Sequence, residues 1–149
     1  MSDAILEPTT AAPEGGPVLS PAQEAAARLK ELFPDVVSDE TREGYEGLVV
    51  YADALPEVAK ALRDELGFNY LSSITGVDLI DDGKLESVYH LYSINRGGGP
   101  IVLHVQTDRN EPVIPSLVPV FQGAEFQERE AYDMFGIRFE GHPDPRRIL

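Results

Sequence analysis

The chain has 149 residues and a formal net charge of −14 at pH 7, because 26 Asp and Glu outnumber 12 Lys and Arg, and it contains no cysteine. The missing cysteine excludes a disulfide framework, a thiolate-ligated zinc or iron–sulfur cluster, and a cysteine nucleophile. The length fits one domain with a sizeable core, and the negative charge argues against nucleic acid or an anionic membrane surface as a general partner.

A flexible acidic tail is predicted at the N-terminus. Residues 1–19 hold three prolines, two glycines and three acidic side chains, and the first cation of the chain is Arg28. This composition favours disorder, and it lacks the basic start and apolar core of a secretory signal. No apolar stretch is long enough to span a bilayer. We therefore expect a disordered tail over 1–19, one domain over 20–149, and a cytoplasmic location.

The first half of the domain predicts two helices and two short strands. The Ser-Pro-Ala-Gln sequence at 20–23 is typical of a helix start, with an N-cap, a proline in the first turn and a capping box. Pro34 ends this helix. Short β-rich segments at 36–37 and 48–51 predict strands. A second helix is expected over 53–66, because its apolar residues recur at helical spacing and a glycine follows.

The middle of the chain predicts an antiparallel meander of three strands, over 68–80, 85–95 and 100–107, with a hairpin turn after the first. A last helical region is expected over 116–135, interrupted near Gly123. Helices packed on a mostly antiparallel sheet make a two-layer α+β domain.

Two histidines of the predicted sheet raise the question of a metal site. His90 and His104 lie in adjacent predicted strands and could face each other across the hairpin. Two imidazoles without a third ligand or an acidic partner make a poor metal site. We therefore expect each histidine to be hydrogen-bonded within the sheet.

The residue types that carry chemistry are concentrated at 128–149, EREAYDMFGIRFEGHPDPRRIL. On a helix with about 100° per residue, Phe126, Arg129, Glu130 and Asp133 share one face, and Glu128 points well away from Glu130. The opposite stripe, which should face the core, consists of Ala124, Ala131, Met134 and Phe135.

Several interpretations of this helix compete. Glu130 and Asp133, with His142, could bind a metal, or two carboxylates could form a catalytic pair. Arg129 on the same face argues against both, because it already neutralises the acids. An ion-pair lattice around Arg129 and a plain solvated face need no ligand. Phe126 among the charges favours a partner-binding surface.

A stiff loop follows the helix. Gly141, His142, Pro143, Asp144 and Pro145 cannot continue a helix or a central strand. The two arginines that come next, at 146–147, are suited to bind carboxylates on a partner, or they pair with acids of this chain.

This C-terminal segment resembles the signature of the C subunit of the proton-pumping NADH:quinone oxidoreductase, respiratory complex I. The matching positions are Glu128, Arg129, Glu130, Asp133, Met134, Phe135, Gly136, Gly141, His142, Pro143, Arg146, Arg147, Ile148 and Leu149. Segments 67–71, 87–91 and 123–126 are also similar to the family, so the resemblance covers about 20–149. Pro145 departs from it, because the family usually has an aliphatic residue there.

The resemblance implies a non-catalytic assembly subunit in the hydrophilic arm of the complex, peripheral on the cytoplasmic side of the membrane. It implies that this chain binds no cofactor, while other subunits use NADH, FMN, iron–sulfur clusters and quinone. Its partners would be the D subunit, which lines the quinone site, and the cluster-bearing subunits. The implied interface comprises Phe126, Glu128, Arg129, Glu130, Asp133, Gly136, Gly141, His142, Pro143, Arg146 and Arg147.

Two alternatives remain open from the sequence. The chain could be the equivalent scaffold subunit of a membrane-bound hydrogenase or another complex I-like oxidoreductase, whose subunits are similar. It could also be a free-standing carboxylate–metal enzyme that uses Glu130, Asp133 and His142.

Overall fold

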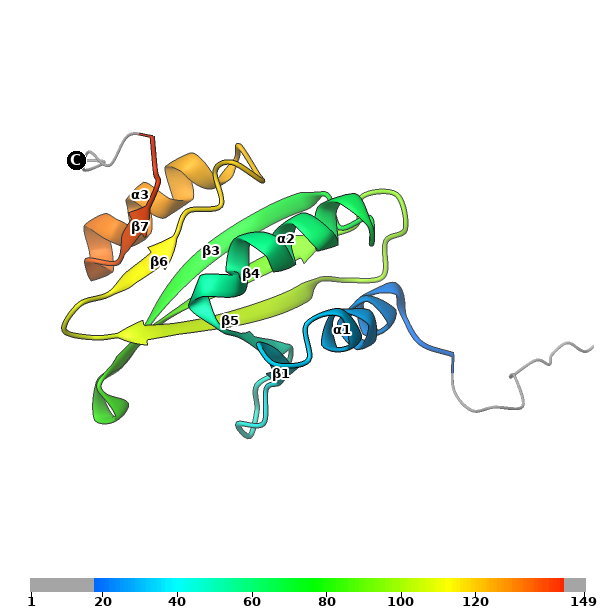
Figure 1. The fold of residues 1–149 in the computed structure, drawn as a ribbon, viewed down its shortest axis with the longest axis horizontal. Coiled ribbons are helices and arrows are strands. Elements are labelled where there is room, and N and C mark those ends of the chain that lie inside the picture. Colours follow the sequence, from blue (N-terminus) through cyan, green and yellow to red (C-terminus); the bar gives the residue numbers. More distant parts are fainter. Residues whose placement is uncertain (1–17, 144–149) are drawn as a thin grey trace, which may run out of the picture.

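The computed structural model describes residues 18–143, so most of the predicted acidic tail and both Arg146 and Arg147 lie outside the described residues. Its centre is a five-stranded sheet with the strand order β1-β2-β5-β4-β3 (Figure 1). The strands are β1 (Val37–Asp39), β2 (Leu48–Val50), β3 (Tyr70–Leu79), β4 (Lys84–Tyr92) and β5 (Ile101–Asp108). The predicted α+β class is therefore confirmed.

The sheet is mixed rather than purely antiparallel. Strands β3, β4 and β5 form the predicted antiparallel meander, and β1 pairs antiparallel with β2. Strand β2 runs parallel to β5, with Leu48 opposite Leu103, and the sequence did not predict this pair. The chain between these two strands passes through a helix and two further strands before it returns, which is the long connection that parallel pairing requires.

Helices α1 (Pro21–Leu32) and α2 (Leu55–Asp64) lie on one side of the sheet (Figure 1). The predicted capping box of α1 is present, because the side chains of Ser20 and Gln23 each accept a hydrogen bond from the other's backbone N–H. Helix α2 follows a 3₁₀ turn, Ala52–Ala54, and buries the predicted apolar stripe. None of the helices within 18–143 is both long and apolar enough to cross a bilayer.

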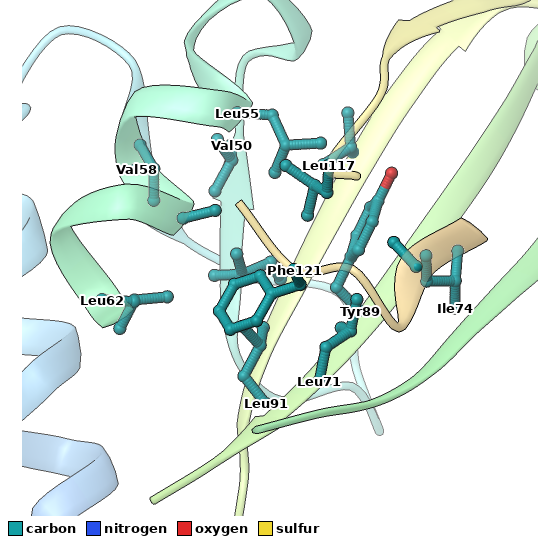
Figure 2. Close-up of a cluster of buried hydrophobic side chains, with 14 of the residues drawn as sticks. Val50, Leu55, Val58, Leu62, Leu71, Ile74, Tyr89, Leu91, Leu117 and Phe121 are labelled. Atoms are coloured by element: carbon teal, nitrogen blue, oxygen red, sulfur yellow. The ribbon is translucent and has the colours of Figure 1, made fainter. Parts of the chain in front are cut away.

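The core lies between the helices and the side of the sheet that they cover. Figure 2 shows side chains from α2, from β3 and β4, and from the segment 116–123 gathered into one cluster. Tyr89, Leu91 and Leu103 are fully buried at alternate strand positions. Each large apolar side chain buried in this way stabilises the fold by roughly 1.5–3 kcal/mol.

The last part of the domain differs from the predicted helix over 116–135. Only Ala124–Phe135 is helical (α3), and the segment 116–123 is a run of turns that places Leu117 and Phe121 in the core. Strand β6 (Val113–Pro115) pairs in parallel with β7 (Arg138–Glu140). These two short strands were not predicted, and the helical spacing of Leu117 and Phe121 was misleading.

Helix α3 packs along β3, the edge strand of the main sheet. The side-chain amide of Gln127 replaces a neighbouring strand there: the Ile74 N–H donates to Oε1 at 2.6 Å, and Nε2 donates to the Ser72 carbonyl at 3.4 Å. These contacts lie beside the irregular pairing between Leu71 and Ser73. The helix therefore covers an edge that would otherwise present free backbone groups.

Replacing Gln127 by alanine removes the acceptor for the Ile74 N–H, so we expect the free energy of unfolding to fall by about 1 kcal/mol. Urea denaturation followed by circular dichroism measures this loss. The same substitution at Gln122, an exposed glutamine just before α3, is the control and should change stability by less than about 0.5 kcal/mol. Equal stability of the two variants contradicts the assigned role.

The prediction that Met134 faces the core is wrong. Met134 is 69% exposed, whereas Ala124 and Ala131 are buried as expected and Phe135 packs against the core. A helix that covers only a sheet edge buries a narrow stripe. On α3 that stripe is centred on Ala124, Ala131 and Phe135, and Met134 lies about a quarter-turn from it.

Candidate partner-binding site

Four residues of the C-terminal motif, Glu128, Arg129, Gly141 and His142, border one cleft. It has a volume of about 410 Å³ and lies between α3 and the β6–β7 pair. Helix α3 contributes Glu128, Arg129 and Tyr132, and β6 contributes Val113. The other wall consists of Arg138, Phe139, Glu140, Gly141 and His142, from β7 and the turn after it. The structure thus brings together the two halves of the motif.

A glycine turn sets the two walls against each other. Gly136 adopts φ +77°, and its N–H donates to the Tyr132 carbonyl at the end of α3. Non-glycine residues rarely adopt this left-handed conformation, which reverses the chain into β7 at once. The role of Gly136 within this chain is therefore to shape the cleft.

Glu128 is fully buried, at 0% exposure. Its carboxylate accepts a hydrogen bond from the Ser116 hydroxyl at 2.7 Å and another from the Leu117 N–H at 2.7 Å. Burial raises the pKa of Glu128 in spite of these donors. Glu128 thus anchors α3 to the start of the segment 116–123.

Glu128 was named as part of the implied interface, but it is already buried within this chain. Glu128 lies within the buried stripe of α3, four residues after Ala124 and three before Ala131. This spacing was a signal in the sequence, and it was missed because a charged residue was assumed to face outward. The two hydrogen bonds at its carboxylate make burial of this residue acceptable.

His142 ties the turn after β7 to α3. Its Nε2–H donates to the Glu125 carbonyl at 2.9 Å, and the same nitrogen lies 3.9 Å from a Glu128 oxygen. Gly141 and Pro143, on either side of it, are exposed. His142 was predicted to belong to the interface, but its side chain makes contacts within this chain. Gly141 and Pro143 remain accessible to a partner.

The outward face of α3 carries exposed apolar side chains. Phe126 is 53% exposed and Met134 is 69% exposed, and the exposed Glu130 lies between them at four-residue spacing. We call Phe126, Glu130 and Met134 the outer face of α3. Arg129 and Asp133 are half-buried beside it. The predicted exposure of Phe126 among charges is confirmed.

The motif does not form the proposed metal site. Within residues 18–143, the one group of three potential ligands with donor atoms within 4.8 Å of one another is Glu40, Glu86 and His104, so Glu130, Asp133 and His142 do not converge. Arg42 donates to both carboxylates of that group, at 2.7 Å and 2.8 Å. Because the Arg42 guanidinium already occupies both carboxylates as a cation, we assign no metal to them.

Comparison with known proteins decides between the remaining interpretations. The family model described as "Respiratory-chain NADH dehydrogenase, 30 Kd subunit" matches residues 48–149, more than half of the chain. The chain belongs to this family.

Individual members of the 30 kDa subunit family extend the match. The C subunit of an NADH-quinone oxidoreductase from Moorella thermoacetica is 45% identical over 123 residues, which are 81% of this chain and 80% of the relative. A fused C/D subunit of an NADH-quinone oxidoreductase from Phocaeicola vulgatus is 42% identical over 104 residues, covering 70% of this chain and 20% of the relative. A solved structure, the trypsin-resistant fragment (1-134) of Nqo5, matches with TM-score 0.66 and 28% identity, covering 83% of this chain and 98% of that chain.

The resemblance to the C subunit of complex I that the C-terminal motif predicted is confirmed. The chain is a subunit of an NADH-quinone oxidoreductase complex and belongs to its hydrophilic arm. It contains no cysteine, so it has no thiolate with which to hold an iron–sulfur cluster of that complex.

Proposed function

We propose that this 30 kDa-family subunit has no active site of its own and serves in assembly, docking onto the D subunit through the outer face of α3 and the rim of the adjacent cleft. The observation that carries the proposal is the exposure of Phe126 and Met134 on the helix that also bears the family motif. Large apolar side chains at the centre of a charged surface are typical anchors of protein interfaces. The fused C/D relative supports the choice of partner, because subunits joined in one chain are held together.

The contacts of the motif residues agree with a structural role. The fully buried carboxylate of Glu128 is hydrogen-bonded to Ser116 and Leu117, and His142 is hydrogen-bonded to the Glu125 carbonyl. Side chains held in this way shape a rigid surface. Electron transfer through NADH, FMN, iron–sulfur clusters and quinone would then take place in other subunits, with this chain on the cytoplasmic side of the membrane.

The predicted contacts of Arg146 and Arg147 belong to the same proposal. Both lie outside the described residues, after the turn at Gly141 and His142 that borders the cleft. Guanidinium groups bind carboxylates in a paired, planar geometry. We propose that acidic side chains of the D subunit or of a cluster-bearing subunit meet them.

Replacing both Phe126 and Met134 by alanine in the assembled complex tests the docking surface. We expect recovery of the D subunit with this chain to fall by about tenfold or more, because each lost anchor costs about 1 kcal/mol or more. Affinity purification in mild detergent, with quantified partner subunits, measures the effect. The stability of the isolated chain should stay within about 0.5 kcal/mol, since both side chains are exposed.

A matched control is Tyr51→Ala, which removes a side chain that is 65% exposed just after β2, away from α3. It should leave assembly unchanged. Normal recovery of the D subunit with the Phe126 and Met134 double variant would show that the outer face of α3 is not the docking surface.

A further inference from the structure

A buried charged cluster lies on the face of the sheet opposite to α1 and α2. Glu86 of β4 and His104 of β5 alternate with the residues that face the core, so they point to the other side. Glu40 and Arg42 reach them from residues 40–47, which we call the β1–β2 loop. The side chains of Glu86, His104 and Glu40 are 1%, 4% and 3% exposed.

The contacts connect the β1–β2 loop to the sheet. One guanidinium nitrogen of Arg42 donates to Glu40 at 2.7 Å and to Glu86 at 2.8 Å. His104 Nδ1 lies 2.5 Å from the same Glu86 oxygen, and its Nε2 lies 2.8 Å from the Glu46 carbonyl. Tyr45 packs against both Arg42 and His104, with its ring centre 4.4 Å from the Arg42 guanidinium carbon and 6.1 Å from the imidazole centre.

The partners of His104 decide its protonation state. Both ring nitrogens face oxygens that act only as acceptors, namely a carboxylate engaged by Arg42 and a backbone carbonyl. A neutral imidazole has one N–H and would leave one of these acceptors facing a lone pair, whereas an imidazolium donates to both. Two carboxylates, one guanidinium and one imidazolium also sum to zero charge. With a neutral ring, the cluster would hold an uncompensated buried negative charge.

We propose that His104 is a buried imidazolium that latches the β1–β2 loop onto the open face of the sheet, and that its deprotonation releases the loop. The loop connects to β5 through the hydrogen bond to Glu46 and to β4 through the Arg42–Glu86 pair. Loss of the proton removes the donor to one of two acceptors, the Glu86 carboxylate or the Glu46 carbonyl, and leaves the buried cluster with an uncompensated negative charge that weakens the hold on the loop. The attachment of the β1–β2 loop to this face of the sheet, which α1 and α2 do not cover, therefore depends on pH.

The pKa shifts of the groups around His104 agree with a protonated imidazole ring. Burial opposes protonation of His104, but Glu86, the Glu46 carbonyl and Glu40 outweigh it, so the pKa lies above its usual value of 6.5. Arg42 lowers the pKa of Glu40 to about 2. Burial raises the pKa of Glu86, but His104 and Arg42 outweigh it, so this pKa is lowered. The other histidine nearby, His90, has its pKa lowered by burial and by the charge of His104.

These directions define the pH window of the latch. The imidazolium contributes fully below the ordinary histidine pKa of 6.5, and its contribution is lost as the pH rises through the raised value in the folded chain. The carboxylates contribute fully above their ordinary pKa of 4.5, and their contribution is lost as the pH falls through the lowered values. The latch is therefore complete between these two ordinary values, and on the alkaline side it opens as His104 loses its proton.

Nitrogen-15 NMR of the 149-residue chain across about pH 5–9 tests the proposal. We expect both ring nitrogens of His104 to stay protonated at pH values where those of His90 no longer are. Above the pKa of His104, the protection factors of the loop amides, which compare each exchange rate with the intrinsic rate at the same pH, should fall by about tenfold or more, since a buried ion pair is lost. In His104→Gln, these protection factors should be low at every pH, and below the pKa of His104 tryptic cleavage after Arg42 should be faster than in the native chain at the same pH.

Two further variants keep the test decisive. Glu86→Gln preserves the side-chain shape but removes the charge, so it should lower the pKa of His104 below that in the native chain. His90→Gln is the matched control, because His90 contacts Ser73 at 3.3 Å rather than the loop, and it should leave loop exchange unchanged. A His104 that loses its proton together with His90, or loop exchange that is the same in native chain and His104→Gln, overturns the proposal.

Discussion

Replacing Glu128 by alanine is expected to reduce the free energy of unfolding by about 3–5 kcal/mol, the largest loss among the substitutions considered. The alanine removes the acceptor of two short hydrogen bonds, from the Ser116 hydroxyl and from the Leu117 N–H, and leaves both donors buried. It also opens a cavity where a fully buried side chain stood. Chemical denaturation followed by circular dichroism measures the change.

Glu130→Ala, two positions along the same helix, is the matched control. Glu130 is exposed, so this change should cost less than about 0.5 kcal/mol. Glu128→Gln should fall between the two alanine variants, because an amide keeps one acceptor oxygen but turns a donor toward Ser116 or Leu117. If Glu128→Ala were no less stable than Glu130→Ala, the anchoring of α3 through this carboxylate would be refuted.

Gly76→Ala is expected to lower the free energy of unfolding by about 1–3 kcal/mol through overpacking. A Cβ at Gly76 would lie closer to the ring carbon Cδ2 of Phe135 than real contacts allow. This is the point where the end of α3 meets the edge strand β3, so the clash pushes α3 away from the sheet. Thermal and chemical denaturation of the variant measure the loss.

The clash has a specific partner, so a double-mutant cycle identifies it. In a Phe135→Ala background the ring is gone, and Gly76→Ala should cost little, which gives a coupling energy of about 1 kcal/mol or more. Gly123→Ala is the control, because a Cβ there meets nothing within 4 Å and φ is −65°. A cost of Gly76→Ala that is the same in both backgrounds would mean that Phe135 does not set the constraint.

The predicted docking role and the stability of the domain depend on different faces of the same helix. The inward face of α3 holds Glu128, Gln127 and Phe135 against the domain, and the outer face carries Phe126 and Met134. Substitutions on the inner face should therefore change stability, and those on the outer face should change assembly. A variant such as Glu130→Ala reports on the outer face without disturbing the inner one.

Several elements were predictable because their causes are local. The capping box at Ser20 and Gln23 and the apolar spacing of α2 involve residues within one or two turns of each other. The meander followed from three β-rich segments joined by short connections. The family also followed from sequence, because the motif residues from Glu128 onward occur in a fixed order along the chain.

Other features depend on which distant segments come together, and only the tertiary structure decided them. The parallel pair of β2 and β5 joins segments separated by a helix and two strands, and the parallel pair of β6 and β7 joins segments on either side of α3. The burial of Glu128 depends on donors at Ser116 and Leu117, and the environment of His104 depends on a loop 58 residues earlier in the chain. The sequence by itself determined the local elements and the family, because both depend on patterns among residues that are close in the chain. The tertiary structure decided the partners of the buried charged residues. A charged residue is buried only where groups distant in the sequence neutralise it or form hydrogen bonds with it.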